Sequence, residues 1–141
     1  MDVVAKRLAD AWDLARVGAK IRRTVESVCE KAQEQGMIQE RNGFLWPLPI
    51  PQDIVVRVPV EGRPESLRKI EHIPPEEIYR AMQLVAEEAI GISRESLIQE
   101  TARLFGFQRS GENVHSRLEE CLELCLEQQI MVMTGENITL G

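Results

Sequence analysis

The chain has 141 residues, with 17 basic and 23 acidic side chains, a formal net charge of -6 and 43% hydrophobic residues. This composition is typical of a soluble globular chain of one ordinary domain or two very small ones, and it excludes a disordered or collagen-like chain. No stretch reaches the about 18 apolar residues of a membrane span, so we expect a cytoplasmic protein without membrane contact. The three cysteines form no Cys-x-x-Cys pair, which favours a reducing compartment over a disulfide framework.

Proline placement divides the chain, because all seven prolines lie between residues 47 and 75. Proline removes a backbone donor and fixes φ, so the flanks can be mainly helical whereas the middle must be extended or looped. We therefore predict an extended connector at 47–74 between segments 1–46 and 75–141. Within it, residues 54–60 could form an edge strand, since Pro59 argues against a central one, or an extended linker lying over a surface.

The net charge is distributed unevenly along the chain. Residues 1–46 hold 8 basic and 7 acidic side chains, 47–74 hold 4 and 4, and 75–141 hold 5 and 12. The acidity therefore belongs almost wholly to the C-terminal segment. We expect the two ends of the chain to contact different kinds of partner.

An internal repeat relates the two flanks. A shift of 93 positions aligns residues 4–46 with 97–139 without a gap, and it superimposes Arg16 and Gly18 on Arg109 and Gly111. The apolar positions of the longer helix also agree, at spacings that make one helical stripe. These positions are Ile21, Val25, Val28, Cys29 and Ala32 in the first copy, and Val114, Leu118, Cys121, Leu122 and Cys125 in the second. We predict a duplication; chance agreement between two amphipathic helices is the alternative.

Each copy is expected to contain a helix, an Arg-x-Gly turn, a longer helix and a pair of short strands. The strands are predicted at 37–40 and 43–46 in the first copy, and at 130–133 and 137–140 in the second, around residues typical of hairpin turns. The second copy has a further helix in front, opened by Pro74 and Pro75. Helix, helix, turn, helix, hairpin is the order of a winged helix, whose third helix enters a DNA major groove.

The sequence therefore predicts a mainly α fold with short β-hairpins, built as tandem winged-helix-like repeats of which the first lacks its leading helix. We expect that the chain is excised from a longer protein. A connector or a second chain that supplies the missing packing surface is the alternative.

Three runs carry a resemblance to a known family: RKIEHIPPEEI, SRESLIQETARLFGFQRSGENVHSRLEECLE and RVGAKIRRTVESVCEKAQEQGMIQERNGFLWP. Together they resemble the C-terminal domain of unknown function of large bacterial superfamily I DNA helicase-like proteins. The resemblance covers nearly all of the chain, and LFGFQRSG, FLWP and IPPEEI are its most specific pieces. It implies a parent protein with an ATP-driven helicase motor, and often a nuclease-like domain, upstream of this module.

No catalytic, cofactor or metal site is predicted within the chain itself. There is no GxxxxGK[ST] phosphate-binding loop, and none of the four lysines has an acidic residue two positions before it, as many nucleases require. Cys121, Cys125 and His115 could suggest a metal, but the two cysteines align with Val28 and Ala32. They are therefore interpreted as small core residues. The aromatic residues Trp12, Trp46, Phe105 and Phe107 are also interpreted as core.

The longer helix of the first copy carries basic and hydroxyl side chains on the face opposite its apolar stripe. This pattern is typical of a helix that follows DNA phosphates, and a solvated face diluted by Glu30 and Glu34 is the alternative. The DNA-binding candidates are Arg16, Lys20, Arg22, Arg23, Lys31 and, at the wing tip, Arg41.

The second copy has lost this charge pattern, because Asn113, Ser116, Glu120 and Leu124 replace the basic and hydroxyl residues. Leu124, Met131 and Met133 are instead candidates for a protein interface, with packing of Leu124 under the connector or against the first copy as the alternative. We expect a non-catalytic accessory module that positions DNA for a helicase motor. A protein interaction or homodimerisation module without DNA contact is the other hypothesis.

Overall fold

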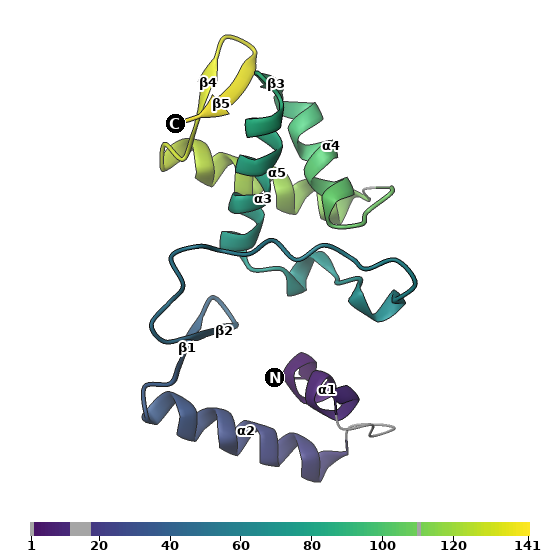
Figure 1. Ribbon diagram of the computed structural model, residues 1–141, viewed down its shortest axis with the longest axis vertical. Coiled ribbons are helices and arrows are strands. Elements are labelled where there is room, and N and C mark those ends of the chain that lie inside the picture. The colour runs from purple at the N-terminus through teal and green to yellow at the C-terminus, as the bar shows by residue number, and fades with distance from the viewer. Residues whose placement is uncertain (1, 12–17, 110) are drawn as a thin grey trace. The chain divides into compact units, whose positions relative to one another are not determined.

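The computed structural model describes residues 2–11, 18–109 and 111–141. It divides into a first unit, residues 1–52, and a second unit, residues 53–141. Five α-helices and two small antiparallel sheets make up the described elements (Figure 1). This confirms the coarser part of the fold prediction, a mainly helical chain with short hairpins. Among the described residues, no helix is both long and apolar enough to cross a membrane.

The first unit consists of two helices and a hairpin. Helix α1 spans Asp2–Ala11 and helix α2 spans Ala19–Glu34, and strands β1 (Ile38–Arg41) and β2 (Phe44–Pro47) pair antiparallel. The hairpin turns at Asn42 and Gly43, whose φ angles of 52° and 80° are those that a tight hairpin turn requires. A small core of Ala5, Val25 and Cys29 joins α1 to α2, with Val4, Leu8, Ile21, Ile38 and Leu45 packed around it.

The second unit contains three helices and a three-stranded sheet. Helices α3 (Pro75–Glu88), α4 (Arg94–Leu104) and α5 (Glu112–Glu127) gather beside the sheet (Figure 1). Strands β3 (Ile92–Ser93), β4 (Met131–Thr134) and β5 (Asn137–Leu140) form the order β3-β5-β4, all antiparallel. Pro75 begins α3, and the Ser93 hydroxyl accepts a hydrogen bond from the Ser96 amide (3.2 Å) to cap α4.

One continuous apolar core holds the second unit together. Every helix and the hairpin contribute to it, because the apolar stripe of each helix faces inward. Its largest members include Ile78 and Met82 of α3, Leu97 of α4, Phe105 after α4, Leu118 and Leu122 of α5, and Met131 and Ile138 of the hairpin.

Residues 53–74 belong to the second unit and do not form a separate connector over 47–74 as the sequence had suggested. Ile70 and Ile73 are buried in the core, and two short 3-10 turns occur at Pro64–Ser66 and Ile70–His72. Residues 54–60 form neither helix nor strand, so the predicted edge strand is wrong and the extended segment over a surface is what the fold contains. Val56 packs against the core and holds this segment there, whereas Val55, Val58 and Val60 are exposed.

The two units share their element bounds at a shift of 93 residues. Helix α2 maps onto α5, β1 onto β4 and β2 onto β5 with both ends coincident. The backbone bonds agree too, since the Met37 amide donates to the Ala32 carbonyl and the Ile130 amide to the Cys125 carbonyl, both at 2.9 Å. The segment 19–47 thus has the same local backbone as 112–140. Trp12 and Arg16 lie outside the described residues, and so does Ser110 of the second Arg-x-Gly turn.

Equivalent positions of the two units differ in burial although their local backbone agrees. At one of them the prediction from the sequence is wrong. Val28 was expected in the buried stripe of α2, but 60% of its surface is exposed, whereas its counterpart Cys121 is fully buried. The difference arises because α3 packs on α5 in the second unit. Among the described residues of the first unit, α2 has only α1 and β1 as packing partners that make comparable contact.

Candidate nucleic-acid interface

The basic face of α2, which we define as Lys20, Arg23 and Lys31, is exposed along the helix. Helix α2 begins after Gly18, whose extended backbone (ψ 170°) directs the chain into the first turn. Val25 and Cys29, four residues apart, hold the opposite side in the small core. The fold therefore directs the basic side chains away from that core, and the three cations lie along about three turns of one helix face.

The three cations of the basic face have no ion-pair partner among the described residues, so their charge remains available. Ser27 is exposed beside them, whereas the Thr24 hydroxyl donates to the Lys20 carbonyl at 2.9 Å. Thr24 is thus satisfied by its own helix.

The remaining DNA-binding candidates are less uniform. Arg22 on α2 and Arg41 at the end of β1 are exposed, and each takes part in an interaction with other groups of the chain. Arg16 lies outside the described residues. Lys20, Arg23 and Lys31 are therefore the candidates that the structure brings together on the face of α2 opposite Val25 and Cys29.

Helix α5 carries no cation at the positions equivalent to the basic face, and its acidic side chains pair with arginines of α4 and of α5 itself. Arg94 forms ion pairs with Glu119 (3.5 Å) and with Glu123, and Arg117 pairs with Glu120 at 3.4 Å. The Asn113 amide donates to the Glu71 carboxylate at 2.5 Å, which lowers the pKa of Glu71. The equivalent positions thus offer no cation to phosphate, so the two helices differ in charge as their sequences predict.

The predicted protein-interface residues have three different environments. Met131 is fully buried in the core of the second unit, so its assignment to an interface is wrong. The reason is its place at the start of β4, the strand that packs against α5, where its side chain joins the core. Met133 is exposed and Leu124 is half-buried.

A buried ion-pair cluster, missed in the sequence analysis, is formed by Arg57, Arg68 and Glu77. Only 2% of Glu77 is exposed. Arg57 donates to its carboxylate from the backbone amide (2.8 Å), Nε (3.3 Å) and a terminal nitrogen (2.9 Å), and Arg68 donates from two terminal nitrogens (2.9 and 2.8 Å). Although burial opposes ionisation, these donors hold the pKa of Glu77 at about 2.

The Arg57–Arg68–Glu77 cluster fixes residues 57–68 against the first turn of α3. Arg68 also donates to the Arg57 carbonyl (2.8 Å), and its guanidinium lies 5.9 Å from the centre of the Phe105 ring. Both oxygens of the Glu77 carboxylate are thus occupied, so the cluster serves the fold and offers no free group for catalysis. The only sequence signal was Arg57, a charge within an apolar run.

The buried thiols of Cys121 and Cys125 are core groups, not nucleophiles. Burial raises the pKa of Cys121 to about 11 and that of Cys125 to about 12, so both are protonated near neutral pH. Within the described residues, no three His, Cys, Asp or Glu side chains are grouped to hold a metal ion.

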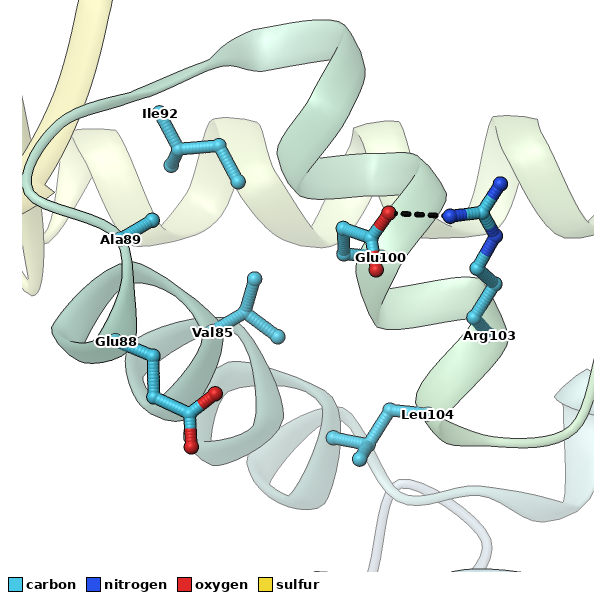
Figure 2. Close-up of a pocket in the computed structure, with 7 residues that line it drawn as sticks. All are labelled: Val85, Glu88, Ala89, Ile92, Glu100, Arg103 and Leu104. Carbon is cyan, nitrogen blue, oxygen red and sulfur yellow. Dashed lines mark hydrogen bonds and ion pairs between the residues drawn. The ribbon is translucent and has the colours of Figure 1, made fainter.

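An open hollow lies between α3 and α4 (Figure 2). Val85, Ala89, Ile92 and Leu104 supply apolar walls, and Glu88, Glu100 and Arg103 supply the polar ones. Glu100 and Arg103 form an ion pair of 2.6 Å one turn apart on α4. The hollow contains no pair of facing acid and base groups that would mark a catalytic site.

We compared the chain with protein families, curated proteins and solved structures. No family model, no curated protein and no solved structure matches the chain. The basic face of α2 is therefore the feature on which a function can be argued.

Proposed function

We propose that the chain is a tandem winged-helix module that binds DNA through its first unit, as a non-catalytic accessory part of a helicase-like protein. The element order α3, β3, α4, α5, β4, β5, with a hairpin after the third helix, supports this for the second unit. The coincident bounds of α2, β1 and β2 support it for the first. In this reading α2 is the helix offered to DNA, and the β1–β2 hairpin is its wing.

The exposed, unpaired cations of the basic face of α2 carry the proposal. Phosphate neutralisation by Lys20, Arg23 and Lys31 releases counterions and supplies sequence-independent affinity. Glu30 and Glu34 lie on the same helix and lower its net positive charge. We therefore expect weak, strongly salt-dependent binding, suited to positioning DNA for a motor domain. The link to a helicase motor rests on the family resemblance of LFGFQRSG, FLWP and IPPEEI.

Fluorescence anisotropy with labelled duplex and single-stranded DNA tests the DNA contact. Affinity of the wild type should fall steeply as salt rises from about 50 to about 200 mM. A triple variant, Lys20→Ala with Arg23→Ala and Lys31→Ala, should bind more weakly and reduce the slope of log affinity against log salt by about 2 to 3.

The matched control removes the same number of exposed cations from the second unit, by Arg63→Ala, Lys69→Ala and Arg109→Ala. This variant should retain most of the affinity and slope. Equal losses of affinity in the two triple variants would show that DNA binds through the general charge of the chain and not through the basic face of α2. Wild-type binding that ignores salt, or none at all, would overturn the proposal.

A second function, self-association without DNA, is favoured by exposed apolar side chains on the β4–β5 hairpin, namely Val132, Met133 and Leu140. Light scattering should then show a mass that rises with protein concentration. Met133→Asp should return the chain to a monomer, whereas Val55→Asp, at another exposed apolar position, should leave the mass unchanged. A wild-type monomer at all concentrations rules this function out.

A further inference from the structure

The basic face of α2 has a short side chain at its centre. Ser27 follows Arg23 by four residues and precedes Lys31 by four, so the three residues form one ridge along the helix. With a rise of about 1.5 Å per residue, the two cations are about 12 Å apart along the axis, and they lie about 40° to either side of Ser27. All three residues are exposed. The ridge thus places a cation one turn before and one turn after a small hydroxyl residue.

The hydroxyl of Ser27 is available to a ligand. Within the part of the chain that the structure describes it forms no hydrogen bond, whereas the hydroxyl of Thr24 donates to the Lys20 carbonyl. A hydroxyl both donates and accepts, so it can bond to the edge of any base pair. Ser27 can therefore bind a base edge without breaking a bond within the helix.

An acidic residue limits the length of the ridge that phosphate can approach. Glu34 follows Lys31 by three residues, is exposed, and lies about 20° from Ser27 around the helix. Its carboxylate repels phosphate at the C-terminal end of α2. At the other end Lys20, also about 20° from Ser27, extends the basic face. The contact therefore lies between Lys20 and Lys31, with Ser27 inside it.

The dimensions of the ridge favour duplex DNA over a single strand. The major groove of B-DNA is about 12 Å wide, which matches the axial separation of Arg23 and Lys31. The two cations can thus reach phosphates on both sides of the groove, while the short Ser27 side chain lets the helix approach the bases. Proteins that hold single strands use exposed aromatic side chains on which bases stack. Of the aromatic side chains that the structure describes in the first unit, Phe44 is half-buried and Trp46 is buried, both on the hairpin.

We propose that Ser27 is the residue of α2 that meets the base edges in the major groove of duplex DNA, with Arg23 and Lys31 on the phosphates at either side. This role rests on the proposed function and specifies its DNA as a duplex. Because a hydroxyl bonds to any base pair, the contact confers little sequence preference. A larger side chain at position 27 holds the helix away from the bases and leaves the cations in place.

Fluorescence anisotropy with a labelled duplex and with its isolated strand tests the role of Ser27. The wild type should bind the duplex about tenfold or more tightly than the strand at about 50 mM salt. Ser27→Leu should weaken duplex binding by about tenfold but keep the slope of log affinity against log salt, since the number of neutralised phosphates is unchanged. Ser27→Ala, which removes only the hydroxyl, should lose much less.

The matched control is Gln33→Leu, which introduces the same side chain at another exposed position of α2. Gln33 lies about 120° from Ser27 around the helix, away from the ridge. This variant should bind the duplex as the wild type does. Circular dichroism should show that the variants at both positions are folded, as expected for exposed residues.

Modified duplexes identify the groove. A bulky group on C5 of every thymine fills the major groove and should weaken wild-type binding by about tenfold, whereas the same group on N2 of every guanine fills the minor groove and should leave it unchanged.

Three results would overturn the role of Ser27 while leaving the phosphate contact of the basic face intact. They are equal affinity for duplex and single strand, equal affinity of Ser27→Leu and Gln33→Leu, and weakening by the minor-groove group alone. Absence of salt-dependent binding to the unmodified duplex would instead overturn the proposed function, so the two failures are distinguishable.

Discussion

The guanidinium of Arg68 and the carboxylate of Glu77, nine residues apart, form two hydrogen bonds of 2.9 and 2.8 Å at the base of α3. Arg68 is only 10% exposed, so it has little access to water if its partner is removed. Breaking a buried pair by removing one partner leaves an uncompensated charge, whose desolvation dominates the effect. The pair is thus a requirement for the fold of the second unit.

Removal of the Glu77 carboxylate should destabilise the protein strongly. We expect Glu77→Ala to lower the free energy of unfolding by about 3 to 5 kcal/mol, measured by urea denaturation. The control is Glu100→Ala, whose partner Arg103 is exposed, with an expected loss below about 1 kcal/mol. Similar losses in both variants would show that the cluster contributes no more than a surface pair.

Glu77 should also make the stability of the protein depend on pH in the acid range. The pKa of Glu77 is lowered from 4.5 to about 2 in the folded chain, so its contribution is present above pH 4.5 and is lost as the pH falls toward 2. The shift corresponds to about 3 kcal/mol. Urea denaturation across this range should show a smaller pH dependence in Glu77→Gln than in the wild type. Parallel pH profiles would contradict the assignment.

The thiols of Cys121 and Cys125 should be protected from alkylation. Burial raises the pKa of both in the folded chain, so the protonated thiols stabilise the fold below pH 9.0, and this contribution is lost as the pH rises through about 11 and 12. At pH 8 we expect mass spectrometry to detect their alkylation only when urea unfolds the second unit. Rapid modification of the folded chain would show that α3 does not cover α5 as described.

Gly106 should tolerate no side chain. Its φ angle is +89°, and an added Cβ would lie 2.7 Å from both Leu67 and Pro59. We expect Gly106→Ala to lower the free energy of unfolding by about 2 to 4 kcal/mol, the sum of backbone strain and overpacking. In Gly36→Ala, where φ is +70° and no atom lies within 4 Å, only the backbone strain of about 1 to 2 kcal/mol applies. Thermal denaturation of both variants would separate the two effects.

The elements of this fold were predictable because their signals are local. Asn42 and Gly43 favour positive φ angles, Pro75 suits a first helical turn, and the apolar stripes repeat at helical spacing. The two predicted hairpins are present with their strands displaced by no more than one residue. The exposed basic face of α2 was likewise visible in the sequence, because a helix has fixed angular spacing.

Burial was harder to predict, because it depends on neighbours that are distant in sequence. Val28 and Cys121 share a helix position, but only Cys121 has a third helix packed near it. Glu77 has the pattern of an ordinary acidic residue in a first helical turn, and the approach of Arg57 and Arg68 depends on the path of the segment before it. Met131 was misassigned because Met131 and Met133 share one face of β4, and only the packing of distant helices decides which of the two is buried.

The coincident bounds of 19–47 and 112–140 have a consequence for engineering the chain. One residue inserted into α2 would rotate all later positions of that helix by about 100°, and one inserted into β1 would turn its side chains to the opposite sheet face. These stretches accept replacements but not changes of length. A tag or reporter therefore belongs at the exposed turn around Gly62, where a Cβ would meet no atom within 4 Å.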